Sequence, residues 1–201
     1  MEYISNKDND LNKHILAHVF FNEAKGIISD IALQPGLILP FMTISEEKYD
    51  LCIQHVAKIF YSCFAKGELK LIVNASEKQL NGYAIFFEHP DPSFARYCHK
   101  IFVYESARGK GIGTQLTNGL LSELSNMTLI CTPELVPFYE NCGMQFGGYF
   151  ELPEDSEDFS FTRGMYHGLA VMNSNGISGP APVFMLNDND IKNLIKLISS
   201  E

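Results

Sequence analysis

The residue types and spacing best suited to chemistry lie at residues 108–114, RGKGIGT. Glycines alternate at positions 109, 111 and 113, so the backbone N–H groups there are bare and can adopt positive φ angles. Arg108 and Lys110 add two cations. A helical pattern begins at Ile112, and the N-terminus of a helix supplies unpaired N–H donors and positive partial charge. This combination predicts a site for an anion, most simply a phosphate group.

Two well-known phosphate loops do not fit this segment. A P-loop needs a glycine four residues ahead of the Gly-Lys pair and a Ser or Thr after the lysine, whereas Lys110 is followed by Gly111. The dinucleotide-binding fingerprint needs a third glycine three positions after the second, and Thr114 occupies that position. The segment is therefore a different glycine-rich turn between a strand and a helix.

The elements on either side of the turn must hold it in place. Residues 97–104 are mostly β-branched or aromatic and predict a buried strand. Alternation places His99, Ile101 and Val103 on one face of that strand, and Cys98, Lys100 and Phe102 on the other. After the turn, helical spacing predicts an amphipathic helix. Its apolar stripe consists of Ile112, Leu116, Leu120, Leu121 and Leu124.

A second motif follows at residues 128–144. Residues 128–132 predict a short strand, and Pro133 suits the first turn of a helix because its φ angle is already set. The sequence FYENCGM at residues 138–144 then predicts a helix that ends at Gly143. The pattern Arg-x-x-Gly-x-Gly, followed at this distance by Phe-Tyr-Glu-x-x-Gly-Met, resembles the GCN5-related N-acetyltransferase (GNAT) family over about residues 37–150.

The resemblance implies a fold and an acyl donor. The fold class is α/β (α+β), with a mixed, mostly antiparallel sheet whose central strands splay apart and whose faces carry helices. In this family the glycine turn holds the pyrophosphate of coenzyme A, and the splayed strand binds the pantetheine arm of acetyl-CoA. The implied cofactor-binding residues are Phe102, Val103, Arg108, Gly109, Lys110, Gly111, Ile112, Gly113 and Thr114.

The implied activity is direct transfer of an acetyl group to a primary amine of a small polyamine-like molecule or a peptide. Tyr139 matches the family's tyrosine that protonates the departing thiolate, and packing against Phe138 is its alternative role. Many relatives carry a carboxylate base on the central strand, where this chain has His99 and Lys100. His99 is the candidate base because histidine titrates near neutral pH. The alternatives are a buried structural histidine, a water chain, or Glu105.

The missing strand carboxylate leaves two other function classes open. One is a non-catalytic module that binds coenzyme A, and the other is a protein-interaction module built on the same fold. His14 and His18 have a helical metal-ligand spacing, but no third ligand accompanies them, so no metal site is predicted.

Composition and charge limit the classes of molecule that this protein could bind. The net charge of −9 argues against nucleic acid and anionic membranes, and it suits a cationic acceptor. The acidic residues Glu151, Glu154, Asp155, Glu157 and Asp158 either attract that acceptor or form an ordinary solvated loop. The five cysteines include no C-x-x-C pair, which predicts reduced thiols in a cytoplasmic protein. No signal-peptide pattern and no membrane-spanning apolar run is found.

Three regions are predicted: a helical extension at residues 1–36, the acetyltransferase domain at residues 37–172, and a linker with a C-terminal helix at residues 173–201.

We expect a helix after Asp8 or Asn9 and a first core strand near residues 37–44. Thr43-x-x-Glu46 predicts a capping box for a long helix that ends near Gly67. Asn81-Gly82 predicts a hairpin turn. The last helix must bury its apolar face on the domain or on a partner, and a homodimer would provide one.

Overall fold

The computed structural model describes residues 2–4, 10–76, 79–89, 91, 94–124, 126–152, 157–174 and 183–199. The chain divides into two compact units. The first unit comprises Met1–Lys7, Phe64–Phe150 and Gly168–Phe184. The second unit comprises Asp8–Cys63, Glu151–His167 and Met185–Glu201. The division into residues 1–36, 37–172 and 173–201 stays a prediction.

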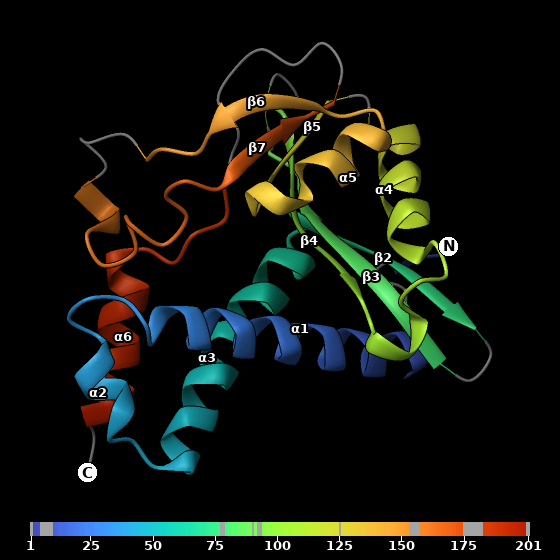
Figure 1. Cartoon of the computed structure of the whole chain (residues 1–201). Helices are drawn as coiled ribbons and strands as arrows, with labels where there is room; N and C mark the ends of the chain where they lie inside the picture. Colours follow the sequence, from blue (N-terminus) through green and yellow to red (C-terminus); the bar gives the residue numbers. More distant parts are fainter. Residues whose placement is uncertain are drawn as a thin grey trace. The chain divides into compact units, whose positions relative to one another are not determined.

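The first unit contains the sheet (Figure 1). Its strands are β1 (Glu2–Ile4), β2 (Leu69–Ser76), β3 (Gln79–Phe87), β4 (Arg96–Val103), β5 (Met127–Cys131), β6 (Gln145–Tyr149) and β7 (Ala170–Asn173). They lie in the order β1-β2-β3-β4-β5-β7-β6. Among these strands β4 and β5 are parallel neighbours, and every other neighbouring pair is antiparallel. The expected mixed, mostly antiparallel sheet is confirmed.

Two helices and two short 3₁₀ turns complete the described part of this unit. They are η1 (Glu105–Ala107), α4 (Ile112–Glu123), η2 (Pro133–Leu135) and α5 (Val136–Asn141). The helix α4 runs along β2, β3 and β4 (Figure 1). Its predicted stripe is confirmed, because Leu116 and Leu120 are fully buried in one core cluster with Leu124. Cys98 and Cys131 belong to the same cluster as free thiols.

The predicted alternation along β4 is wrong at its centre. Ile85 of β3 pairs with Lys100, but the next residue, Phe86, pairs with Cys98, so β4 carries one extra residue at His99. Such a β-bulge reverses the facing of the residues on one side of it. Cys98 therefore shares the α4 face of the sheet with Ile101 and Val103, and His99 does not.

The predicted hairpin turn at Asn81-Gly82 is also wrong, because both residues lie inside β3. A Cβ atom on Gly82 would lie 2.6 Å from the carbonyl oxygen of Phe102 on β4. This is far closer than a carbon and an oxygen tolerate, so β3 and β4 can meet here only at a glycine. The glycine that suggested a turn instead permits close approach of two backbones.

The second unit is helical. Its elements are α1 (Asp10–Ile31), α2 (Ile38–Met42), most of α3 (Glu46–Ala65), η3 (Glu157–Phe159) and α6 (Asp188–Ser199). The expected helix near the N-terminus is confirmed, and its proposed caps Asp8 and Asn9 lie outside the described residues. The helix α6 contacts α2 and η3 and buries Ile191 and Leu194. No described helix is both long enough and apolar enough to cross a membrane.

The segment before α3 differs from its predicted structure. Residues 38–42 form α2 and not the expected first strand. Pro40 is compatible with this helix because a proline in the first turn removes no intrahelical hydrogen bond. Thr43 does not cap α3; its hydroxyl donates to the carbonyl of Leu39 at 3.3 Å. Ser45 is the cap, and its hydroxyl accepts the N–H of Lys48 at 3.3 Å. The long helix itself is confirmed.

Candidate functional site

The centre of the candidate site is the point where β4 and β5 separate. The two strands pair at Arg96 with Met127, at Tyr97 with Thr128 and at Cys98 with Leu129. Beyond Cys98 the structure pairs no described residue of β4 with β5, although β4 continues to Val103. Among the described residues, the backbone of the second half of β4 is therefore bonded to β3 on one side and not paired with β5 on the other.

The direction of each backbone group on β4 follows from its contacts with β3. The carbonyl of Phe102 approaches Gly82 of β3, and the N–H of Tyr104 donates to the carbonyl of Asn81 at 3.0 Å. Because N–H and C=O groups alternate sides along a strand, the groups of Ile101 and Val103 point away from β3. Of the two predicted residues Phe102 and Val103, only Val103 offers its N–H to the open side. Sequence reasoning did not select Ile101 as a binding residue.

The glycine turn connects η1 to α4. Gly109 and Gly111 have φ angles of 75° and 72°, which lie in the left-handed region that side chains disfavour. A Cβ atom on either residue would meet nothing within 4 Å. Glycine is therefore required here by backbone conformation, and the space beside the turn is open. Gly111 precedes the first helical residue of α4, and no side chain caps that helix.

The open end of α4 carries the features expected of an anion site. Its first N–H groups, those of Ile112, Gly113 and Thr114, have no carbonyl partner within the helix. Lys110 donates from Nζ to the carbonyl of Ser106 at 2.9 Å, and Arg108 donates from Nε to the carbonyl of Val103 at 3.4 Å. Both cations are thus held beside the turn by main-chain oxygens. The structure brings all the predicted residues of the turn together.

A polar network that sequence reasoning missed supports this turn. Gln79 Nε2 donates to the hydroxyl of Ser106 at 2.6 Å. Asn74 Nδ2 donates to Gln115 Oε1 at 3.2 Å, and Asn81 Nδ2 donates to Asn74 Oδ1 at 3.1 Å. These bonds tie the ends of β2 and β3 to η1 and to the first turns of α4. The only local signal was the concentration of amide side chains near the strand ends.

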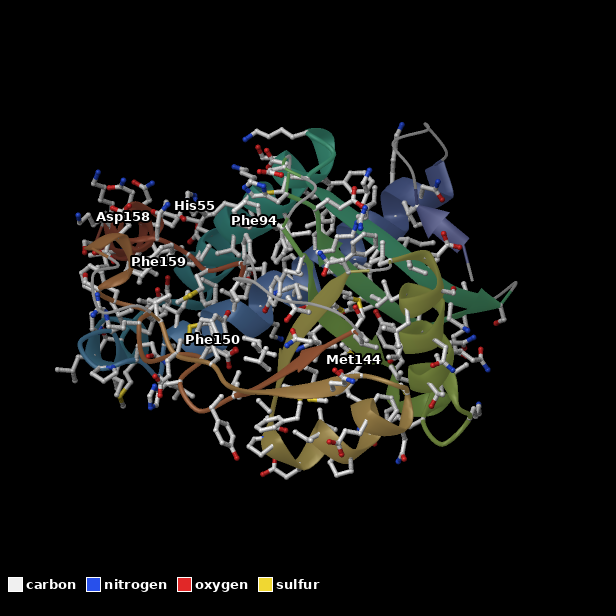
Figure 2. The ribbon with its side chains drawn as sticks, turned by 90° about the horizontal axis from the view of Figure 1, so that it is seen from above. His55, Phe94, Met144, Phe150, Asp158 and Phe159 are labelled. Carbon is white, nitrogen blue, oxygen red and sulfur yellow. The ribbon has the colours of Figure 1, made fainter. Side chains whose placement is uncertain are left out.

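Tyr139 lies on α5, on the face of the sheet that carries α4. It is 7% exposed and belongs to the same core cluster as Cys98 and Cys131. Its carbonyl accepts the N–H of Met144, labelled in Figure 2, at 3.0 Å. Burial raises the pKa of the phenol above its ordinary value, and the neighbouring thiols of Cys98, Cys131 and Cys142 raise it further. The phenol therefore stays protonated at working pH and can donate a proton.

His99 lies among aromatic rings. The distances from its ring centroid are 6.0 Å to Phe87, 6.0 Å to Tyr97 and 5.4 Å to Phe184. Removal from water, together with the smaller effect of the positive charge of Lys100, lowers its pKa to about 3. His99 is therefore neutral at working pH, and its nitrogen holds a proton too weakly to deprotonate an ammonium group efficiently.

The two predicted catalytic residues lie on opposite faces of the sheet. Tyr139 packs in the cluster that contains Cys98 and Phe86, whereas the ring of His99 contacts Tyr97 and Phe87. Side chains of adjacent residues on a strand point to opposite faces. The structure thus brings Tyr139 to the separated strands on one side and His99 on the other.

The hydroxyl of Thr128 is a further polar group near the point where β4 and β5 separate. Thr128 of β5 is 1% exposed, and its hydroxyl has no hydrogen-bond partner among the described residues. Thr128 pairs with Tyr97 in the sheet, so the two side chains share the His99 face. A buried hydroxyl without a partner is costly, and a polar ligand at the separated strands would satisfy it. Sequence reasoning did not select this residue.

The acidic segment is described only in part. Glu151 and Asp158 are exposed, Glu154 and Asp155 lie outside the described residues, and the side chain of Glu157 is not described. No cluster of three or more His, Cys, Asp or Glu residues in the described chain could hold a metal ion.

The first unit therefore offers a continuous set of groups for an extended ligand. The space beside Gly109 and Gly111 is open, the end of α4 can bind a phosphate, and the free side of β4 can bond an amide-containing arm. These features fit coenzyme A. Tyr139 adds a proton donor on the α4 face of the separated strands.

Comparison with known proteins supports the same assignment. A family model described as an acetyltransferase (GNAT) domain matches residues 43–148, which is more than half of the chain. The resemblance based on the two motifs is thus confirmed. A search of curated proteins returned no match.

Solved structures with some similarity include three bacterial proteins. A mutant of the spermidine N-acetyltransferase SpeG from Vibrio cholerae is 19% identical over 61% of this chain and 74% of its own, with a TM-score of 0.47. ElaA from Escherichia coli is 18% identical over 53% and 68%, with a TM-score of 0.41. An acetyltransferase from Bacillus subtilis in complex with CoA is 16% identical over 60% and 84%, with a TM-score of 0.45.

Proposed function

Because the chain belongs to the GNAT family of acetyltransferases, we propose that it transfers the acetyl group of acetyl-CoA directly to a primary amine. The acyl donor of this family is acetyl-CoA, which supplies a reactive thioester carbonyl when bound. The observation that supports the proposal is the separation of β4 from β5 beyond Cys98, next to the uncapped N-terminus of α4.

The glycine turn would bind the pyrophosphate. The N–H groups of Ile112, Gly113 and Thr114 would donate to phosphate oxygens, and the charges of Arg108 and Lys110 would balance the phosphate charge. The positive φ angles of Gly109 and Gly111 keep side chains away from the ligand. The cations now bonded to main-chain carbonyls would turn toward the phosphates.

The separated strands would hold the reacting end. The N–H of Val103 points to the open side of β4, where it could donate to a carbonyl oxygen as negative charge develops. The N–H of Ile101 lies one step back along the same side. Tyr139 would donate its phenolic proton toward the sulfur, because the raised pKa of the phenol keeps that proton in place.

The acceptor amine must lose a proton before it attacks. His99 has a pKa lowered to about 3, so it is a weak base, and its neutral ring would mainly shape and orient the acceptor. We assign removal of the proton to a water chain or to Glu105, which is exposed next to the end of β4.

The charge of the protein supports the proposed acceptor class. The net charge of −9 attracts cationic molecules and repels anionic ones. A small polyamine-like molecule or a peptide amine fits this field, and Glu151 and Asp158 are exposed carboxylates that would contribute to it.

A second candidate function is a module that binds coenzyme A without catalysing transfer. The lowered pKa of His99 favours it, because it makes His99 a weak base. The central strand β4 offers no carboxylate that could act as the base instead. Both functions require the coenzyme A cradle, which is formed by the glycine turn at residues 108–111 and the first N–H groups of α4, and they differ only in turnover.

The test is calorimetric titration with acetyl-CoA of the wild type, Gly111→Glu and the matched control Gly26→Glu. Gly26 lies on α1, where a Cβ atom would meet nothing within 4 Å, so the control adds the same charge outside the cradle. We expect the wild type and the control to bind with similar affinity, and Gly111→Glu to lose binding. Thiol release with a panel of primary amines then separates transfer from simple binding. Absence of acetyl-CoA binding by the wild type would overturn the proposal.

A further inference from the structure

A cavity in the first unit lies at the opposite end of α4 from the glycine turn. Its volume is about 300 Å³, and it is lined by Lys70, Phe86, Glu88, Arg96, Glu123 and Leu124. A helix of 12 residues is about 18 Å long at 1.5 Å per residue. The cavity is therefore separate from the proposed coenzyme A cradle.

The cavity has a defined floor and wall. Lys70 and Phe86 pair across β2 and β3, and Phe86 belongs to the core cluster beneath α4. Glu88 and Arg96 come from the chain at the ends of β3 and β4. Leu124 is buried where α4 ends. Three strand ends and one helix end thus surround the same space.

The strand side of the cavity carries an excess of positive charge. Arg96 Nε donates to Glu88 Oε1 at 2.9 Å, which pairs these two charges. Lys70 Nζ lies 3.9 Å from Glu88 Oε2, and 41% of the Lys70 side chain is exposed. One carboxylate thus faces two cations, so the ammonium group of Lys70 can accept a further anionic partner.

The helix side of the cavity carries an uncompensated negative charge. Glu123 is the last residue of α4, and the last turn of this helix contains no basic residue. Within the described residues Glu123 has no ion-pair partner. The C-terminal end of a helix is itself the negative end of the helix dipole. This wall therefore favours a cation.

We propose that this cavity binds a small zwitterion of the α-amino acid class. Its carboxylate would lie against Lys70, its ammonium group would lie against Glu123 and the end of α4, and an apolar side chain would contact Phe86 and Leu124. A ligand with only a positive charge would face Lys70 and Arg96. A ligand with only a negative charge would face Glu88 and Glu123. Only a molecule that carries both charges matches both walls.

The test uses three probes that share the same branched apolar group. L-valine carries both charges, isobutylamine carries only the ammonium group, and isovalerate carries only the carboxylate. We expect saturable binding of L-valine in amide chemical-shift titrations, with shifts at the end of α4 and at Lys70, and much weaker binding of the other two probes. Equal binding of either single-charge probe, or no saturable binding of L-valine, overturns the proposal.

Two variants test the walls separately. Glu123→Gln and Lys70→Met should each weaken L-valine binding about tenfold, the usual effect of losing one charge-assisted hydrogen bond. Lys58→Met removes an exposed charge on α3 and serves as the control. Thermal unfolding checks that each variant is folded. Unchanged L-valine affinity in both wall variants contradicts the assignment, and acetyl-CoA binding is measured separately because this cavity does not depend on the proposed function.

Discussion

Gly82 of β3 and the carbonyl of Phe102 on β4 are so close that a Cβ atom at position 82 would lie 2.6 Å from that oxygen. The contact fixes more than the distance between two strands. It orients the carbonyl of Phe102 toward β3, and alternation then orients the N–H of Val103 toward the open side of β4. The geometry of the proposed carbonyl-binding donor thus depends on a glycine on the neighbouring strand.

Gly82→Ala should therefore reduce both stability and activity. The neighbouring atom is a backbone oxygen, so the strands must move apart to admit the methyl group. We expect a loss of about 1–3 kcal/mol in the free energy of unfolding, the range typical of overpacking, and a lower kcat. Urea unfolding and acetyl transfer assays measure the two effects.

The matched control is Gly26→Ala. A Cβ atom on Gly26 meets nothing within 4 Å, and the residue lies inside α1, where alanine is favoured over glycine by about 0.5–1 kcal/mol. This variant should be slightly more stable than the wild type. Wild-type stability in Gly82→Ala would show that the strands adjust without cost, and the argument for Val103 would then fail.

The helical patterns of α4 and α5 were predicted correctly from the sequence. The stripe of α4 depends on helical spacing, and the end of α5 at Asn141 depends on the left-handed φ angle of 89° at Gly143, which follows it. The extra residue at His99 could not be predicted this way. It becomes visible only when β4 is paired with β3, and no local pattern in residues 97–104 encodes that register.

The same limit applies to the candidate site. The glycine turn is contiguous in sequence, so its residues could be found together. Other features of the site could be found only from the fold. The buried hydroxyl of Thr128 and the bond from Gln79 to Ser106 involve separate strands, and the role of Ile101 depends on the direction of its backbone N–H. The interpretation of His99 changed most between sequence and structure, because its low pKa arises from burial among Phe87, Tyr97 and Phe184.

The stability of the protein should fall in acid partly because of His99. Its pKa is lowered from 6.5 to about 3 in the folded state, so between these values the unfolded state binds the proton more strongly. The stability gained by keeping this histidine neutral is present above the unfolded pKa and is lost as the pH falls toward the folded pKa. Urea unfolding at about pH 7.5 and about pH 5 measures the difference.

The variant His99→Gln isolates this contribution, because glutamine is polar and does not titrate in this pH range. We expect a smaller loss of stability between the two pH values than in the wild type. His18 on α1 is exposed, and His18→Gln is the control that should leave the wild-type difference in place. An identical pH dependence in His99→Gln and the wild type would contradict the lowered pKa.

In the second unit, the C-terminal end of α6 should depend on Lys48. The Nζ of Lys48 donates to the carbonyl of Ile198 at 2.8 Å, and it places a positive charge at the negative end of that helix. Lys48→Met should cost about 1 kcal/mol, the usual net value of one hydrogen bond. Amide hydrogen exchange should become faster in the last turn of α6 and not in α4. Lys58→Met, on the same helix as Lys48 and exposed, should leave exchange in α6 unchanged.

Tyr139→Phe tests the proposed proton donor. The variant keeps the ring that packs with Phe138 at a centroid distance of 5.0 Å and removes only the hydroxyl. We expect kcat to fall about tenfold to a hundredfold, a modest effect for a general acid because a thiolate leaves readily. The Kd for acetyl-CoA should not change.

Phe138→Leu provides the contrasting variant. The ring of Phe138 would lie 3.5 Å from a Cβ atom on Gly113, so it packs against the first turn of α4, and its loss should weaken acetyl-CoA binding more than it lowers kcat. The rate of the wild type should not fall between neutral pH and about pH 10, because the pKa of Tyr139 lies above its ordinary value of 10.0.

If Tyr139→Phe retains the full kcat, the hydroxyl donates no proton in the rate-limiting step, and the role of Tyr139 is packing.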